Sequence, residues 1–156
     1  MNSVLVIGIG DETLGDDAIG PTVAQQLESY MPKEVSIKRL SGEALGLIAA
    51  WENASKAIVL DAVKTGASPG TIHRFEPLNS TPFPVSHAPS SHQFGIAEAV
   101  EMGRVLDRLP QTLVIFGVEA EGFERGDPMS PKVRAAVPIL QRRVIEEIEL
   151  GVKVNA

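Results

Sequence analysis

The stretch "VLVIGIGDETLGDDAIGPTVAQQL" covers residues 4–27 and determines the predicted fold. It opens with an almost uninterrupted apolar run over residues 4–9, which is typical of a strand buried on both faces of a parallel sheet. Further along, Ile19, Val23 and Leu27 recur every four residues and predict an amphipathic helix. A buried strand followed at once by a helix is the first unit of an α/β fold.

The rest of the chain repeats this alternation of strands and helices. Strands are predicted at residues 35–40, 56–63, 71–77 (an edge strand) and 112–118, and helices at 44–51, from about His92, and from Pro131 to just before Gly151, with Ser130 as N-cap. This order predicts one domain over residues 1–156, a three-layer α/β sandwich whose mainly parallel, twisted sheet of about five strands has helices on both faces.

Composition excludes several classes of function. The formal charge is −6 and the Lys and Arg residues form no block, so nucleic acid and anionic membrane are not expected partners. The chain has no cysteines, which rules out disulfides, thiolate zinc sites and a cysteine nucleophile, and we expect a cytoplasmic protein. The apolar run near the N-terminus is too short for a membrane span and lacks the features of a signal peptide. A cation or a cationic peptide suits this charge best.

Acidic residues gather where the predicted strands end. Four acids lie between residues 11 and 17, Asp61 closes the apolar run of the third strand, and His92 begins a helix. Ligands of parallel α/β sheets bind beyond the carboxyl ends of the strands, so we expect Asp17, Asp61 and His92 to converge there. Two carboxylates and an imidazole form a ligand set suited to a divalent first-row metal with open positions.

Each of these residues also has a structural interpretation. Asp16 or Asp17 would serve as a helix cap, and His92 as a capping or packing residue. Asp61 is harder to explain in this way, because an acid in an apolar strand is costly unless it has a partner. A paired-aspartate protease, in which Asp17 and Asp61 share a proton without metal, stays open as an alternative.

Three further residues have less specific interpretations. His73 and His87 are expected to be capping or packing residues, and Glu119 has either a peptide-binding role or a structural hydrogen bond. Residues 77–91 contain four prolines and predict a long loop that could close over a peptide.

A nucleotide site is disfavoured by the glycine spacing. Glycines at positions 8, 10 and 15 do not form G-x-G-x-x-G, and no Gly-Lys-Ser/Thr follows them. The neighbouring carboxylates would also repel a pyrophosphate. The glycines therefore provide a sharp turn off a buried strand, and the acids after them suit a cation.

Four segments in order carry a resemblance to a known family: "VLVIGIGDETLGDDAIGPTVAQQL", "IVLDAV", "SSHQFGIAEAV" and "VIFGVEAEGFERGDPMSPKVRAAVP". Together they resemble the [NiFe]-hydrogenase maturation endopeptidases. The resemblance implies a twisted sheet with helices on both sides, and an enzyme that removes the C-terminal tail of a hydrogenase large-subunit precursor after nickel insertion. The family's metal-contacting positions fall on Asp17, Asp61 and His92. The nickel is expected to arrive in the substrate as the recognition signal, and another divalent metal could replace it in the isolated enzyme.

Two departures from the family concern which hydrogenase is processed. Asp11 stands where the family usually has Asn, and "LSGEALG" (residues 40–46) replaces an Asp-Gly-Gly-Thr type sequence.

Two other functions stay open: a maturation chaperone that contacts the metal site without cutting, and a small-molecule hydrolase on a similar sheet. The resemblance leaves two mechanisms open as well, in which either the metal polarises the scissile carbonyl or a carboxylate activates water.

Overall fold

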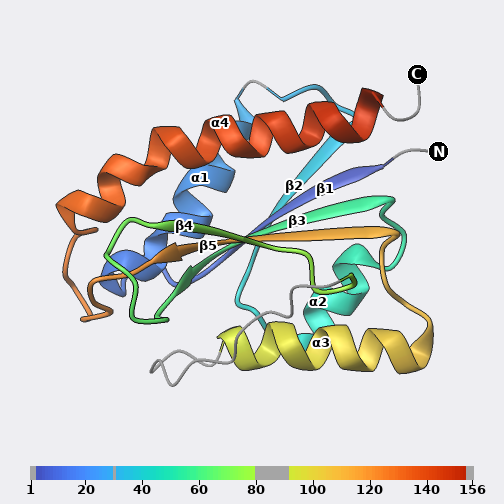
Figure 1. Cartoon of the computed structure of the whole chain (residues 1–156), viewed down its shortest axis with the longest axis horizontal. Helices are drawn as coiled ribbons and strands as arrows, with labels where there is room; N and C mark the ends of the chain where they lie inside the picture. The colour runs from blue at the N-terminus through green and yellow to red at the C-terminus, as the bar shows by residue number, and fades with distance from the viewer. Residues whose placement is uncertain (1–2, 30, 80–91, 154–156) are drawn as a thin grey trace.

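The computed structural model describes residues 3–29, 31–79 and 92–153, with only the backbone of residues 92–94 and 151–153. Strands and helices alternate along these ranges (Figure 1). In chain order the elements are β1 (Val4–Ile9), the 3₁₀ helix η1 (Gly15–Ala18), α1 (Ile19–Glu28), β2 (Val35–Leu40), α2 (Ala44–Trp51), β3 (Lys56–Val63), β4 (Ile72–Phe75), α3 (His92–Leu106), β5 (Thr112–Glu119) and α4 (Pro131–Lys153).

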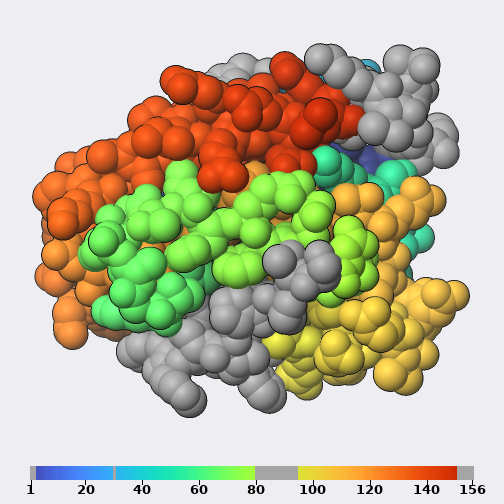
Figure 2. Space-filling view, in the orientation of Figure 1, coloured from blue at the N-terminus to red at the C-terminus, as the bar shows by residue number. Residues whose placement is uncertain are grey.

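The strands of the described residues form one five-stranded sheet in the order β2-β1-β3-β5-β4. β1 pairs in parallel with β2 and β3, and β3 pairs in parallel with β5. β4 pairs antiparallel with β5 and lies at the edge, and Figure 2 shows its segment on the surface between α4 and α3. The predicted class, a mainly parallel sheet of about five strands, is confirmed.

Helices cover both faces of this sheet (Figure 1). α1 and α4 pack on one face, where buried side chains such as Ile19, Val23 and Leu140 meet the strands. α2 and α3 pack on the other face, around Trp51 and Ile96. Because the central strands are covered on both sides, every residue of β1 is buried, as its apolar run predicts. This confirms the three-layer arrangement.

Three sets of predicted bounds are wrong. The edge strand β4 spans only Ile72–Phe75 of the predicted residues 71–77. α4 continues to Lys153, so Gly151 lies inside the helix and is not its C-cap. Glycine weakens a helix by about 1 kcal/mol but keeps its backbone N–H, so a long packed helix can run through it. β5 also extends one residue beyond the prediction, to Glu119, because that residue still pairs with Val63 of β3.

Glycines allow α1 to approach the sheet closely. A Cβ on Gly20 would lie 2.5 Å from the carbonyl oxygen of Ile9 and 2.6 Å from that of Leu60. Only glycine therefore fits where α1 crosses the ends of β1 and β3. The turn before it depends on Gly10, whose φ is 149°, and a Cβ there would meet the carbonyl oxygen of Asp17 at 2.0 Å.

Within the described ranges, no helix is both long and apolar enough to cross a membrane.

Candidate active site

The carboxyl ends of β1 and β3 form the switch point of the sheet. From β1 the chain moves to β2 on one side, and it later returns to β3 on the other, and ligands of open α/β sheets bind beyond such a point. The β1–β3 pairing ends at Gly8 and Leu60, whereas β3 continues to pair with β5 as far as Val63. Asp61 is the first residue of β3 beyond its pairing with β1, and it is fully buried.

The alternation of β3 directs Asp61 toward the face covered by α2 and α3. Leu60 and Ala62, its neighbours in the strand, pack in the core on the α1 and α4 side. Val59 and Val63 pack in the core on the opposite side. Asp61 shares their face, and its Oδ1 accepts a hydrogen bond of 2.9 Å from the N–H of Ala62.

Asp17 lies in η1, directly after the turn that leaves β1. It is fully buried, and its Oδ2 accepts a hydrogen bond of 2.8 Å from the N–H of Asp11. η1 contacts β3, and Gly20, three residues further on, lies so close to both strands that an added Cβ would clash with the carbonyl oxygens of Ile9 and Leu60. Asp17 and Asp61 are therefore two buried carboxylates at the same switch point.

Asp16, next to Asp17, has a different role. One of its oxygens accepts hydrogen bonds from the N–H groups of Glu121 and Gly122 and from the hydroxyl of Ser130, at 2.7, 3.2 and 3.0 Å. The other oxygen accepts the N–H of Ser130 at 2.7 Å. Asp16 thus fastens η1 to the loop between β5 and α4. Neither η1 nor α1 has a side-chain cap, so the capping interpretation of Asp16 and Asp17 is wrong.

The backbone of His92 begins α3, as predicted, and its side chain lies outside the described atoms. One turn later, Gly95 packs on the turn between β2 and α2, where a Cβ would lie 2.0 Å from the carbonyl oxygen of Gly42. α3 therefore begins at the carboxyl edge of the sheet (Figure 1). Among the described side chains no three His, Asp or Glu residues form a metal-binding group, so the convergence of Asp17, Asp61 and His92 stays a prediction.

Glu119 is a structural residue. Its buried carboxylate accepts hydrogen bonds from the N–H and hydroxyl of Thr65, at 2.8 and 2.5 Å, and lies 3.1 Å from Nε2 of His73. Burial raises the pKa of Glu119, but the hydrogen bonds from Thr65, His73 and Gly66 outweigh it and hold the pKa below the ordinary value of 4.5. The structural interpretations of Glu119 and His73 are confirmed, whereas His87 and most of the proline-rich loop (residues 80–91) lie outside the described residues.

Sequence reasoning missed a buried ion-pair group that joins α4 to the sheet. Glu147 of α4 accepts hydrogen bonds from Nζ of Lys56 at 2.9 Å and from Nε of Arg74 at 2.5 Å. Burial raises the pKa of Glu147, but Arg74 and Lys56 lower it below its ordinary value. No spacing rule links these three residues, because they meet only once the sheet and α4 are assembled.

The fold and these carboxylates define an α/β protein with an acidic site at the switch point of its sheet, chemistry that suits a cation. Residues 21–147 match the family model of the hydrogenase maturation proteases, and the chain belongs to this family. It is accordingly a peptidase.

Individual relatives agree with this assignment. The chain is 28% identical to the hydrogenase 2 maturation protease of Escherichia coli over 154 residues, covering 96% of this chain and 93% of the relative. It is 29% identical to the hydrogenase expression/formation protein HupD of Bradyrhizobium diazoefficiens, covering 85% and 71%. Among solved structures, the hydrogenase maturating endopeptidase HybD from E. coli has a TM-score of 0.80 at 26% identity, covering 94% of this chain and 92% of that one.

Proposed function

We propose that this peptidase removes the C-terminal tail of a [NiFe]-hydrogenase large-subunit precursor after nickel insertion, and that the nickel of the substrate is its recognition signal. The observation that carries the proposal is the pair of fully buried carboxylates at the switch point, Asp17 in η1 and Asp61 in the part of β3 beyond its pairing with β1. Membership of the maturation protease family supports a precursor as the substrate. The cytoplasmic location of the peptidase stays a prediction.

In this proposal Asp17, Asp61 and His92 complete the coordination of the nickel that the precursor carries. Carboxylate oxygens and an imidazole nitrogen are ligands that a first-row divalent ion accepts. The precursor carries both the nickel and the scissile bond. Binding the nickel therefore also holds the scissile bond near Asp17 and Asp61. Peptide hydrolysis then uses either a carboxylate as general base on water or polarisation of the carbonyl by the metal. The same site would hold a surrogate divalent metal.

The test measures tail removal from nickel-loaded precursor by mass spectrometry of its C-terminus. We expect Asp17→Asn, Asp61→Asn and His92→Gln each to lower the cleavage rate by roughly 10²-fold or more. Glu149→Gln, an exposed acid on α4, serves as the control and keeps the wild-type rate. Unchanged cleavage in all three site variants would refute the assignment of the site.

Two outcomes separate the proposal from its alternatives. A precursor that binds the wild-type protein but keeps its tail would indicate a chaperone that does not cut. Equal cleavage of nickel-loaded and nickel-free precursor would favour a paired-aspartate protease in which Asp17 and Asp61 share a proton.

A further inference from the structure

The outer edge of β2 presents main-chain groups without a partner among the described residues. β2 lies at one end of the sheet and pairs with β1 only. The carbonyl oxygen of Leu40 accepts a hydrogen bond from Gly10, so the main chain of Leu40 faces β1. Successive residues of a strand face opposite sides, and Ile37 and Arg39 therefore turn their N–H and C=O groups away from the sheet. Within the described ranges no hydrogen bond is made to these outward groups.

The side chains of β2 leave this edge accessible from both faces of the sheet. Ser36, Lys38 and Arg39 are exposed, and the other residues of the strand are only half-buried. Ser36 and Lys38 also line a pocket of about 180 Å³ beside α2. Exposed Lys and Arg residues on an edge strand commonly prevent aggregation, so the charges by themselves identify no partner. The position of the edge beside the candidate active site identifies one.

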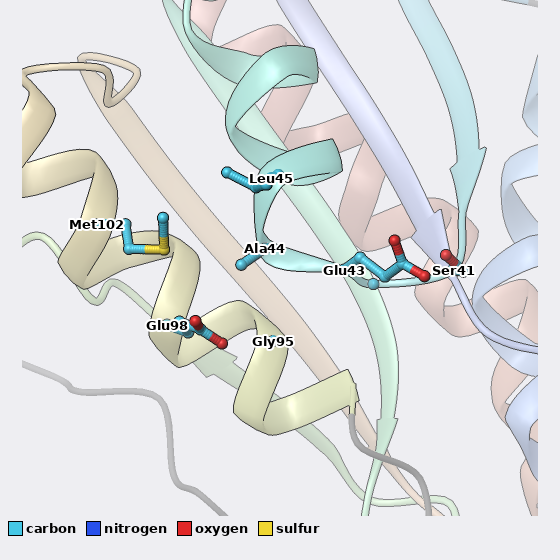
Figure 3. Close-up of a pocket in the computed structure, with 8 residues that line it drawn as sticks. Ser41, Glu43, Ala44, Leu45, Gly95, Glu98 and Met102 are labelled. Atoms are coloured by element: carbon cyan, nitrogen blue, oxygen red, sulfur yellow. The ribbon is translucent and has the colours of Figure 1, made fainter.

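A surface depression joins the edge of β2 to the candidate active site. It has a volume of about 600 Å³ and extends from Gly10 and Asp11, after β1, to Arg39 near the end of β2. Ser41, which follows β2 (Figure 3), lines this depression and also a pocket of about 410 Å³ between the β2–α2 turn and α3. The N–H of Asp11 donates to Asp17. A peptide cut at the switch point therefore has a continuous path through the depression to the open edge of β2.

We propose that the tail of the precursor, the segment that cleavage releases, binds as an added antiparallel strand along the outer edge of β2. The body of the precursor stays with its nickel at the switch point, whereas the tail is a free end that can lie along a strand. A tail that passes the carboxyl end of β2 first runs in the direction opposite to β2. Main-chain hydrogen bonds of this kind hold extended peptides at sheet edges. This inference rests on the proposed function and specifies how its substrate is held.

The geometry of an antiparallel pair determines the contacts of the tail. Ile37 and Arg39 each exchange two hydrogen bonds with the tail residue opposite. Side chains directly opposite share a face of the sheet, so we expect an acidic tail residue opposite Arg39 and an apolar one two residues later, opposite Ile37. Arg39 pairs with Glu12 at 3.5 Å, and the two side chains are 45% and 54% exposed. Such a surface pair is weak, so an acidic tail residue can replace Glu12 at little cost.

The experiment compares kcat and KM of Arg39→Pro and Arg39→Ala for cleavage of nickel-loaded precursor. Both variants lack the guanidinium group, but only proline also removes the outward N–H, and edge strands tolerate proline at such a position. We expect KM of Arg39→Pro to lie roughly threefold to tenfold above that of Arg39→Ala, with kcat within about twofold, because one hydrogen bond to the tail is lost. Ile37→Pro and Ile37→Ala form a second matched pair, and thermal unfolding shows whether each variant is folded.

A proline scan of the tail uses the wild-type protein and does not depend on the folding of any variant. Only alternate N–H groups of the tail face β2, so proline should raise KM at every second position opposite the strand and leave KM near the wild-type value between them. Equal KM values for folded Pro and Ala variants at both positions, or a tail scan without alternation, would overturn the inference while leaving the proposed function intact.

Hydrogen exchange separates failure of this inference from failure of the proposed function. If the wild-type protein does not cut nickel-loaded precursor, the proposed function fails. Slower exchange of the Ile37 and Arg39 amides on addition of the same precursor would still support the added strand, and unchanged exchange would refute it. Slow exchange that depends on the protein's own concentration, without precursor, would show that a second copy of this chain pairs with β2 and would also overturn the inference.

Discussion

Replacing Asp16 by Asn should destabilise the protein far more than removing one surface charge. The four hydrogen bonds to Asp16 come from three backbone N–H groups and one hydroxyl, all donors. An amide can place its oxygen on only one side, so its NH₂ group must face the N–H of Ser130 or those of Glu121 and Gly122. The variant loses at least one charge-assisted hydrogen bond and leaves a donor without an acceptor, at a cost of about 2–4 kcal/mol.

The assay is urea and thermal unfolding of Asp16→Asn beside the wild-type protein and Ser130→Ala. For a chain of this size the cost corresponds to a fall in Tm of roughly 5–15 °C. Ser130→Ala removes only the hydroxyl donor at 3.0 Å and keeps the backbone N–H at 2.7 Å, so it should cost about 1 kcal/mol. If Asp16→Asn unfolds at the wild-type midpoint, the carboxylate does not fasten η1 to the β5–α4 loop, and this reasoning is wrong.

Two further predictions concern the ion-pair group and the packing of α1. The pKa of Glu147 lies below its ordinary value of 4.5, so its contribution to stability is complete above that pH and is lost as the pH falls through the folded-state pKa. Glu147→Gln should cost roughly 3 kcal/mol at neutral pH and give a shallower acid limb in a plot of unfolding free energy against pH; an unchanged acid limb would contradict this. Gly20→Ala should destabilise by roughly 1–3 kcal/mol, because its Cβ meets two backbone oxygens. Gly46→Ala, where nothing lies within 4 Å of the added Cβ, should stabilise α2 by about 0.5–1 kcal/mol, and equal midpoints for the two variants in urea would refute the packing argument.

Much of the fold could be predicted because its strands are buried on both faces. Such strands are uninterrupted apolar runs, and the observed bounds of β2, α2 and β3 are those predicted from the runs and breaks in the sequence. The order of the strands in the sheet is harder to predict from the sequence. The position of β4 beside β5, antiparallel at the edge, depends on contacts between segments far apart in sequence. The predicted end of α4 is wrong for a related reason: a helix whose buried face packs on the sheet as far as Ile148 can continue through Gly151 despite the weak helix propensity of glycine.

The candidate site could be predicted only in part. The rule that ligands bind beyond the carboxyl ends of parallel strands identifies Asp17 and Asp61, and both are buried at the switch point. The pocket between the β2–α2 turn and α3 has no comparable signal, because the residues that line it come from two distant segments that meet only in the folded chain. Glu119 shows that the strand-end rule also selects residues without a ligand role. It lies at the end of a parallel strand, but its carboxylate is hydrogen-bonded to Thr65 and His73.

Asp16 and Asp17 show why adjacent residues of one type cannot be told apart by spacing. In a 3₁₀ helix successive side chains point about 120° apart, so the four residues of η1 turn one carboxylate toward the β5–α4 loop and the next toward the turn after β1. The first carboxylate is held by donors from another part of the chain. The second accepts the N–H of Asp11 in the turn that leaves β1, at the switch point where we expect the substrate to bind. Fastening Asp16 therefore fixes the direction of Asp17, and the rigidity of the site comes from a neighbour that we do not expect to touch the substrate.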